Sequence, residues 1–337
     1  MPDFPAGSTA ECRMILRLER SNPHECKRQS IRDKGELHMP EPWSAEHQVS
    51  PELALQLIRS QFPQLPSHRI ESLGAGWDNT AYLLGADVVF RFPRRLIAVE
   101  LLETESRVLP LLSAQLPLPV PVPRWRGAPS QDFPWTFHGY RMLPGRRADC
   151  VELTHQHRCS IAAELGEFLR ALHSIPPNQL PLPPDTIGRT DLRPKVAVMR
   201  ERADALEKTG LFDASLVHHL LEQPLPARSS RSVVVHGDLY ERHLIVNEQH
   251  CISGVIDWGD VHVGDPAVDL SIVYRLLPAE ERDAFYRVYG QIDARTAAMA
   301  QWRAAFHALQ LAAYLHSTND TAGLNVTRKS LQYIFQD

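Results

Sequence analysis

The segment from Val233 to Asp257 restricts the possible folds of this chain more than any other part. Its apolar runs Val233–Val235, Leu244–Val246 and Ile252–Ile256 are separated by polar turns, which predicts short β-strands. The sequence on both sides instead carries apolar residues mostly at helical spacing, and no internal repeat is present. A strand hairpin embedded among helices indicates an α+β fold.

The sequence upstream of this segment predicts a second group of strands. Two strands, over residues 69–84 and 88–92, join around a turn and suggest an antiparallel hairpin. A helix is expected from Ala98 to Leu112. The alternating prolines of Leu116–Pro123 then force extended backbone, and Trp135–Met142 reads as another strand.

Helical patterns account for most of the remaining chain. One helix is expected to begin at Ser50, where a capping serine, a first-turn proline and an early acidic residue follow one another. Further helices are predicted over residues 160–173, 194–209 and 213–221, and from Pro266 to the end of the sequence.

The length of 337 residues corresponds to two domains or lobes, at about 150 residues each. We predict an N-terminal lobe over residues 39–143 and a larger, mainly helical C-terminal lobe over residues 144–337. Residues 1–38 mix both charge signs without sustained periodicity. They are expected to be a disordered tail, or to precede a true start at Met39.

Composition excludes several classes of protein. The net charge is −4 and the chain has no long run of Lys and Arg, which argues against a nucleic-acid-binding protein. No apolar stretch is long enough to cross a membrane, and the first residues do not resemble a signal peptide. The five cysteines form no C-x-x-C pair and no zinc spacing. A cytoplasmic protein is therefore expected.

Two carboxylates stand at the ends of the predicted hairpin. Asp238 follows the strand Val233–Val235, and Asp257 ends the strand that returns after Asn247. Because a hairpin brings its strand ends together, we expect Asp238 and Asp257 to meet. Paired carboxylates at such a place suit Mg²⁺ binding and general-base chemistry.

Three motifs in this region resemble those of aminoglycoside phosphotransferase-like enzymes, a superfamily of small-molecule kinases. They are His236-Gly-Asp238-Leu, Ile256-Asp257-Trp258 and Gly264-Asp265-Pro-Ala-Val-Asp269-Leu. The resemblance covers roughly residues 50–335 and implies a bilobal, protein-kinase-like fold. It also implies that Asp238 is the catalytic base, that Asp257 binds Mg²⁺, and that ATP or GTP donates the phosphoryl group.

The resemblance assigns supporting roles to other residues. Gly74 and Gly76 lie where a phosphate-covering loop is expected, although two glycines could equally form an ordinary hairpin turn. His236 is expected to anchor the catalytic loop. Asp269 is expected to bond the backbone of that loop or His236, and Asp265 to cap the helix that follows.

The distribution of lysine limits how the nucleotide can be held. Only five lysines occur, and none lies between Lys34 and Lys195. Kinases of the resembled type place a lysine on the third strand of the N-terminal lobe, paired with a glutamate on the next helix. Here the matching cation is Arg91, with Glu105 as its expected partner; an ordinary surface arginine is the alternative.

A second departure from the resembled pattern is His243, which stands five residues after Asp238 where asparagine is usual. Histidine is a poorer ligand for Mg²⁺ than an oxygen donor. Some family members that resemble macrolide phosphotransferases also carry histidine here. His243 is therefore a candidate metal ligand, with a hydrogen bond to phosphate or Asp238, or a purely structural role, as alternatives.

The phosphoryl acceptor stays open at this point. A hydroxyl of an aminoglycoside, of a macrolide or of a metabolite is compatible with the resemblance. Four aromatic residues could line an apolar acceptor pocket or belong to the core: Tyr274, Trp302, Phe306 and Tyr314. The two departures at Arg91 and His243 keep a non-catalytic nucleotide-binding protein as the alternative function. A protein kinase is disfavoured, since no Ala-Pro-Glu segment follows Asp257.

Overall fold

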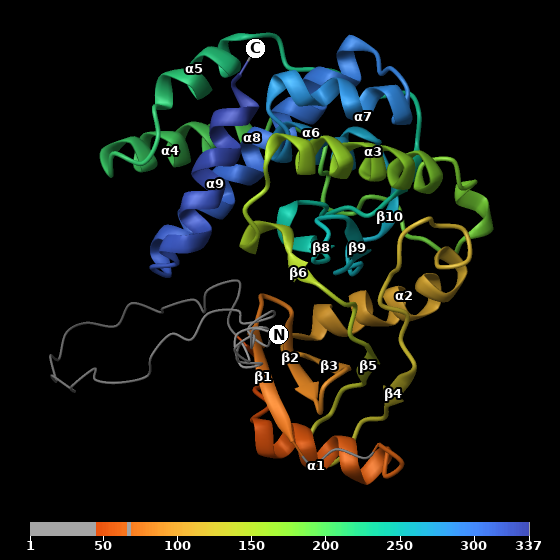
Figure 1. Cartoon of the computed structure of the whole chain (residues 1–337). Coiled ribbons are helices and arrows are strands. Elements are labelled where there is room, and N and C mark those ends of the chain that lie inside the picture. Colours follow the sequence, from red (N-terminus) through yellow and green to blue (C-terminus); the bar gives the residue numbers. More distant parts are fainter. Residues whose placement is uncertain (1–44, 66–68, 337) are drawn as a thin grey trace, which may run out of the picture. The chain divides into compact units, whose positions relative to one another are not determined.

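The computed structural model of the chain describes residues 45–65 and 69–336, which divide into two compact units (Figure 1). The first unit contains the described residues up to Glu103 together with Pro123–Met142, and the second contains Thr104–Val122 and Leu143–Asp337. The predicted tail at residues 1–38, and Met39 as its alternative start, lie outside the described residues. Each unit is described by itself below.

The first unit is built on a five-stranded antiparallel sheet in the order β1-β2-β3-β5-β4. The strands are β1 (Ile70–Ala75), β2 (Asn79–Leu84), β3 (Val88–Pro93), β4 (Trp125–Gly127) and β5 (Phe137–Arg141). The predicted antiparallel hairpin is confirmed in β2 and β3, which pair from Asn79 opposite Pro93 to Leu84 opposite Val88. The expected strand at Trp135–Met142 is present as the shorter β5.

Helix α1 (Pro51–Gln61) covers this sheet and begins where the sequence predicted. The hydroxyl of Ser50 accepts a hydrogen bond from the Leu53 amide at 3.2 Å, and proline occupies the first turn. The buried face of α1 packs against a cluster of aromatic rings from the strands. Within that cluster the rings of Phe92 and Phe137 stack with their centroids 4.5 Å apart.

Helix α2 (Leu96–Leu112) starts two residues earlier than predicted. Its last turns carry Val108, Leu109 and Leu112, which are fully buried and belong to the core of the second unit. The proline-rich residues that follow form neither helix nor strand before β4, as alternating prolines require.

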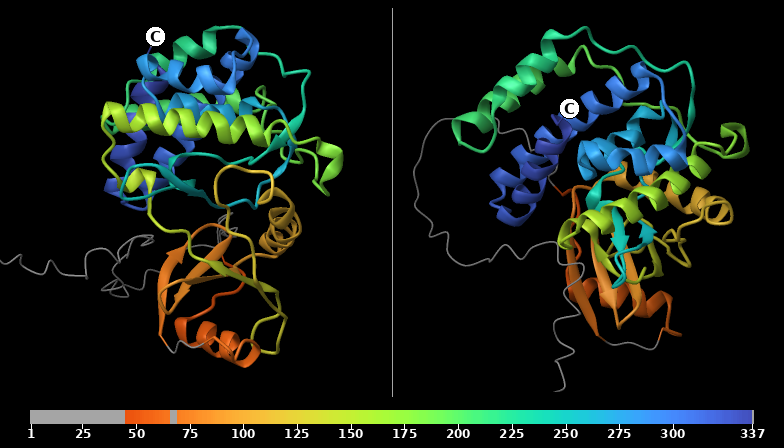
Figure 2. Two further views of the ribbon diagram at one scale, coloured as in Figure 1. Left: turned by 45° about the vertical axis from the view of Figure 1, so that its right-hand side comes forward. Right: turned by 45° about the horizontal axis from the view of Figure 1, so that its top comes forward.

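The second unit is mainly helical. Its α-helices are α3 (His155–Leu172), α4 (Lys195–Lys208), α5 (Ala214–Glu222), α6 (Ala267–Leu276), α7 (Arg282–Tyr289), α8 (Ala294–Ser317) and α9 (Thr321–Ile334). Figure 2 shows α3 lying alongside the short strands of this unit. The helix α3 begins five residues before the predicted Ser160, because Thr154 and His157 form a reciprocal capping box.

The predicted pairing of the two later strands is confirmed, but the strand before Asp238 belongs to a second small antiparallel sheet. Strand β8 (Leu244–Val246) pairs with β9 (Ile252–Val255), and β6 (Arg146–Arg147) pairs with β8. Strand β7 (Val233–Val235) pairs instead with β10 (His262–Gly264). The ends of β7 and β9 nevertheless lie together, since the His236 ring after β7 is hydrogen-bonded to the Ile256 backbone oxygen after β9.

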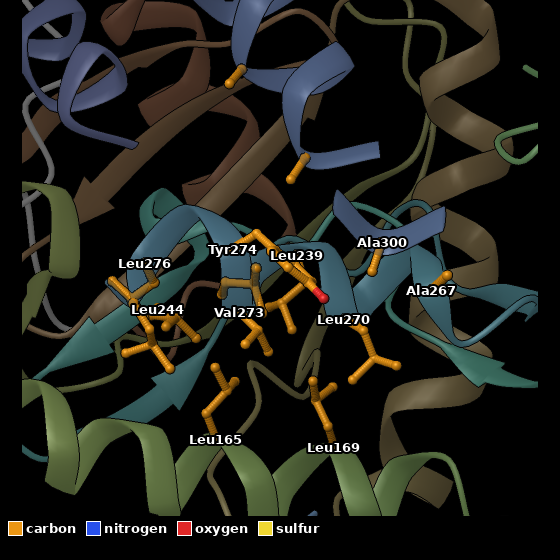
Figure 3. Close-up of a cluster of buried hydrophobic side chains, with 14 of the residues drawn as sticks. Leu165, Leu169, Leu239, Leu244, Ala267, Leu270, Val273, Tyr274, Leu276 and Ala300 are labelled. Atoms are coloured by element: carbon orange, nitrogen blue, oxygen red, sulfur yellow. The ribbon is translucent and has the colours of Figure 1, made fainter. Parts of the chain in front are cut away.

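The core of the second unit centres on α6, all ten residues of which are buried. Leu165 and Leu169 of α3 face Leu270 and Val273 of α6 (Figure 3). The start of α6 is fixed by Asp265, whose carboxylate accepts a hydrogen bond from the Ala267 amide at 2.9 Å, as predicted. A fully packed helix of this kind is a rigid support for residues that project from it.

No helix in the described part of the chain combines the length and apolar character needed to cross a membrane.

Candidate active site

The loop that carries Asp238 is held at the end of a buried strand. All three residues of β7 are buried, and the chain turns at Gly237 with a φ of +91°. A side chain at this position would place its Cβ 2.1 Å from the backbone oxygen of Asp260. Only glycine fits there, and the turn leaves 37% of the Asp238 side chain exposed.

Asp269 of α6 holds the backbone of this loop by hydrogen bonds. Its Oδ2 accepts a hydrogen bond from the His236 amide at 2.7 Å, and its Oδ1 accepts one from the Gly237 amide at 3.0 Å. The ring of His173 lies 3.3 Å from Oδ2. Burial acts to raise the pKa of Asp269, but the bond with His173, the nearby histidine rings and the Gly237 amide outweigh it and lower the pKa. The buried carboxylate is therefore ionised, and each of its oxygens accepts a hydrogen bond from the loop backbone.

His236 connects the loop to the end of β9. Its Nε2 donates a hydrogen bond to the backbone oxygen of Ile256 at 3.0 Å, and its Nδ1 accepts one from the Asp238 amide at 3.3 Å. The ring is completely buried and packs on Trp258 with centroids 4.7 Å apart. Burial lowers its pKa, which keeps the ring neutral. These contacts anchor the residues that precede Asp238 and Asp257.

His243 stands between the two carboxylates that the sequence expected to meet. Its Nδ1 donates a hydrogen bond to the backbone oxygen of Asp238 at 2.7 Å and lies 3.8 Å from Oδ2 of the same residue. Its Nε2 lies 3.4 Å from Oδ2 of Asp257. The structure thus brings Asp238, His243 and Asp257 together. Asp257 has a left-handed backbone with a φ of +66°, a strained conformation of the kind found at functional sites.

The residues near Asp257 fit a divalent cation that is also bound by substrate phosphates. Since Nδ1 of His243 carries the hydrogen, a neutral ring leaves Nε2 as an acceptor that faces the carboxylate oxygen of Asp257. A cation between these two atoms would contact both. In the described part of the chain, no group of three or more His, Cys, Asp or Glu residues forms a complete metal site. A single carboxylate such as that of Asp257 can hold Mg²⁺ when substrate phosphates supply further ligands.

Asp238 has a neighbour that the sequence did not reveal. Nε2 of His307, on α8, lies 3.6 Å from Oδ1 of Asp238. Partial burial acts to raise the pKa of Asp238, but the polar groups around the carboxylate, first among them His307, lower it overall. The exposed carboxylate is therefore ionised near neutral pH and can accept a proton from a hydroxyl group.

Arg303 lies one helical turn before His307 and was also missed. Its Nε is buried, and no hydrogen-bond partner for it exists in the part of the chain that the structure describes. Burial and the charge of Arg189 lower its pKa to about 10, against the opposing charge of Asp238. The guanidinium therefore remains charged and interacts electrostatically with the Asp238 carboxylate.

Of the two roles left open for the four aromatic residues, acceptor pocket or core, the core is confirmed for two of them. Trp302 is 1% exposed and Tyr274 is 8% exposed, and both lie in the main apolar cluster of the second unit. Phe306 packs against that cluster and stacks on Trp302 with centroids 5.7 Å apart. Their helical spacing reflects core packing, so these three residues do not support an apolar acceptor pocket.

The predicted nucleotide-binding residues occupy defined positions. Arg91 lies on β3 opposite His138 of β5 and is 8% exposed, and Glu105 lies on α2 and is 1% exposed. Burial and the charges of Arg126 and Arg91 lower the pKa of His138 to about 4, against the effect of Glu103. His138 is therefore neutral and adds no charge next to Arg91, and Arg126 on β4 is paired with Glu103. The pairing of Arg91 with Glu105 stays a prediction.

Of the glycines predicted to cover phosphates, Gly74 lies near the end of β1 and Gly76 lies in the connection between β1 and β2. Gly74 has a φ of +120° at an irregularity in the pairing of β1 with β2. The Gly76 amide donates to the backbone oxygen of Asn79 at 2.9 Å, and Arg94 donates to the Gly76 oxygen. These hydrogen bonds hold the connection as a hairpin turn. Its role in binding a nucleotide stays a prediction.

We expect Asp269→Asn to lower the free energy of unfolding by about 2 kcal/mol. An amide has one acceptor oxygen, so one of the two loop amides, of His236 or Gly237, would face an NH₂ group. Because the folded pKa of Asp269 lies below its ordinary value of 3.8, its contribution is present above that value and lost as the pH falls below it. Below that pH, the free energy of unfolding should therefore change less with pH in the variant than in the wild type.

Urea unfolding near pH 7 and near pH 3 measures both effects. Asp213→Asn is the matched control, because Asp213 is an exposed cap of α5 and asparagine caps equally well. Equal unfolding midpoints for the two variants at neutral pH would contradict the role of Asp269 in holding the loop.

Comparison with known proteins identifies the family. The model of the phosphotransferase enzyme family matches residues 69–309, which include the sheet of the first unit and the loop around Asp238. The chain belongs to the phosphotransferase enzyme family. The resemblance that His236-Gly-Asp238 and the two later motifs carry is therefore confirmed.

Members of the phosphotransferase enzyme family are also found among individual relatives. The aminoglycoside 3′-phosphotransferase of Streptomyces fradiae is 28% identical over 161 residues, which cover 44% of this chain and 56% of that protein. The uncharacterized protein YcbJ of Bacillus subtilis is 29% identical over 70 residues, which cover 21% of this chain and 23% of that protein. The chain thus spans about a quarter to somewhat over half of the length of these curated relatives.

Solved structures confirm the fold class. An aminoglycoside 2′-phosphotransferase-IIIa in complex with GDP has a TM-score of 0.63 at 23% identity, covering 85% of this chain and 98% of its own. The macrolide 2′-phosphotransferase MphH of Brachybacterium faecium has a TM-score of 0.59 at 22% identity, covering 83% and 98%. The α+β fold of the phosphotransferase enzyme family is therefore present in this chain.

Proposed function

We propose that this protein transfers the γ-phosphoryl group of ATP or GTP to a hydroxyl group of a small molecule, in a Mg²⁺-dependent reaction. One observation carries the proposal. Asp238 presents an exposed, ionised carboxylate on a loop fixed by Asp269 and His236, and His243 connects it to the exposed carboxylate of Asp257. A positioned base beside a cation site is what phosphoryl transfer to an alcohol requires.

Each residue has a defined part in this proposal. Asp238 orients the acceptor hydroxyl and takes its proton as the oxygen attacks the γ-phosphorus. The bond between that phosphorus and the bridging oxygen breaks, and the nucleoside diphosphate leaves. Asp257, with His243 beside it, would hold Mg²⁺ together with the phosphates, and when bound the cation would supply positive charge toward them. Arg91, paired with Glu105, holds phosphate oxygens, and the turn at Gly74 and Gly76 covers them.

We infer the chemical class of the phosphoryl donor and of the acceptor from related proteins of the family. Solved relatives include complexes with GDP and kanamycin and with streptomycin and ATP, and a macrolide 2′-phosphotransferase. We propose an aminoglycoside, a macrolide or a hydroxyl-bearing metabolite as acceptor. A cytoplasmic location, where nucleoside triphosphates are abundant, and the absence of nucleic-acid and membrane partners stay predictions.

The test is a nucleotide-turnover screen with the full chain and Mg²⁺. ATP and GTP are each combined with aminoglycosides, macrolides, amino alcohols and sugars, and release of nucleoside diphosphate is followed. Acceptor-dependent release that disappears when Mg²⁺ is chelated supports the proposal. Nucleotide binding without any turnover, with acceptor or with water, would favour the non-catalytic alternative that the arginine at 91 and the histidine at 243 suggest.

We expect Arg91→Met to raise the KM for the nucleotide by about 10- to 100-fold, because a charge-assisted hydrogen bond to phosphate is lost. The change in kcat should be smaller. Arg91→Lys is the matched control, since it keeps the positive charge and restores the residue type that related kinases use here. Steady-state kinetics with varied nucleotide measures the effect. Equal KM values for Arg91→Met and the wild type would show that Arg91 does not hold phosphates.

A further inference from the structure

A chain of polar side chains runs from the interior of the second unit to Asp238. Glu241 and Arg275, which are 3% and 1% exposed, form a two-pronged ion pair with N–O distances of 3.1 and 2.5 Å. Nη1 of Arg275 lies 2.9 Å from Nδ1 of His307, and Nε2 of His307 lies 3.6 Å from Oδ1 of Asp238. The chain thus connects a short turn before β8 with α6, α8 and the catalytic loop.

The direction of the hydrogen bonds in this chain follows from chemistry. A guanidinium group only donates, so Nδ1 of His307 must accept from Arg275. In a neutral ring the hydrogen is then on Nε2, the atom that faces Asp238. Partial burial and the charge of Arg275 lower the pKa of His307 to about 3, so the ring stays neutral near pH 7.

The ring of His307 is also held by packing. The ring of Tyr240 meets it nearly at right angles, with centroids 4.8 Å apart. The guanidinium of Arg275 lies over the same tyrosine ring at 5.2 Å, and Glu241 fixes that guanidinium in turn. The orientation of Nε2–H toward Asp238 is therefore set by three neighbouring side chains.

We propose that His307 is a positioning residue for Asp238. It donates its Nε2–H to Oδ1, which fixes the rotation of the carboxylate and leaves Oδ2 for the acceptor hydroxyl. The separation of 3.6 Å is longer than a hydrogen bond, and we expect it to shorten when substrates bind, as catalytic contacts often do. The proposal rests on the proposed function, in which Asp238 is the catalytic base.

The state of His307 can be measured without any activity. In histidine-labelled ¹⁵N protein, long-range ¹H–¹⁵N correlation spectra report which ring nitrogen carries the hydrogen, and the His307 signals are assigned by their loss in His307→Asn. We expect the Nε2–H form, unchanged between about pH 8 and pH 5. An Nδ1–H form, or a ring that becomes protonated in that range, would overturn the proposal even if Asp238 is the base.

Two variants separate positioning from a purely structural role. Glutamine places its amide nitrogen near the position of Nε2, so His307→Gln keeps a donor toward Asp238. Asparagine places its oxygen near the position of Nδ1, so His307→Asn keeps the acceptor for Arg275 but does not reach Asp238. Thermal unfolding of both variants establishes that each is folded.

The readout is kcat and KM for Mg²⁺-dependent nucleotide turnover, with an acceptor from the screen or with water. We expect His307→Asn to lower kcat by about 10- to 100-fold with little change in the KM for nucleotide, because a displaced catalytic group slows the reaction by such factors. His307→Gln should keep kcat within about threefold of the wild type, because its amide donor is displaced only slightly from the position of Nε2. If the kcat of His307→Gln is equal to or lower than that of His307→Asn, the proposal is overturned.

Asp238→Asn serves as the reference in the same assay. If that variant turns over as fast as the wild type, the proposed function itself fails, and the NMR measurement still decides the state of His307. If Asp238→Asn is inactive and both His307 variants are fully active, only the positioning role is wrong.

Discussion

Replacing Asp238 by asparagine is expected to lower kcat by about 10²- to 10⁴-fold, the usual contribution of a general base. The amide has nearly the same shape as the carboxylate, so the loop held by Asp269 and His236 should keep its conformation. It cannot accept the hydroxyl proton at neutral pH. The KM for nucleotide should change little, because Asp238 is assigned to the acceptor side of the reaction.

The measurement is acceptor-dependent release of nucleoside diphosphate at saturating Mg²⁺. Asp204→Asn is a matched control, because Asp204 is also partly exposed, at 43%, and faces a histidine, His218, at 2.8 Å. It lies on α4 and has no assigned catalytic part, so full activity is expected. An Asp238→Asn enzyme with more than about half of the wild-type rate would contradict a catalytic base at this position.

Gly237→Ala is expected to have the largest effect of any small substitution on the structure of the site. A Cβ at this residue would lie 2.1 Å from the backbone oxygen of Asp260, and the φ of +91° is unfavourable for any side chain. We expect a loss of about 3 kcal/mol in the free energy of unfolding, from strain and overpacking together. Activity should fall as strongly as for Asp238→Asn, since the loop must move to relieve the contact.

Gly210→Ala separates the steric contact from the backbone strain. Gly210 follows α4 with a φ of +71°, and a Cβ there would meet no atom within 4 Å. This variant should lose only about 1 kcal/mol, the cost of a left-handed backbone for alanine, and should keep full activity. Urea unfolding and the turnover assay together test the pair. Equal stability losses in the two variants would show that Asp260 yields to the side chain and that the loop does not require glycine.

Much of the second unit could be predicted because its signals are local. The apolar run Val233–Val235, the turn at Gly237 and the capping carboxylate of Asp265 all act within a few residues, and each lies where the sequence placed it. The hairpin of β8 and β9 followed from two apolar runs around a polar turn. Family motifs then identified Asp238, His243 and Asp257 as a group, and the structure brings them together.

Other features could not be predicted from local patterns. Trp302 and Phe306 have a helical spacing that suits a core as well as a pocket. Only the packing of α8 shows that Trp302 belongs to the core and that Phe306 packs against it. The early start of α3 at His155 depends on a capping box in which histidine takes the place of the usual glutamate. The pairing of β7 with β10 also depends on a contact between segments that are separated by the whole hairpin.

By itself the sequence determined the strand–turn–strand segment, the absence of lysine near Arg91 and the family to which the chain belongs. Only the tertiary structure decided what surrounds Asp238. His307, Arg275 and Glu241 lie on three different elements, and nothing in their spacing indicates that they meet. Backbone preferences act over a few residues, whereas these contacts exist because α6 and α8 pack on one core and carry their polar side chains to the same place.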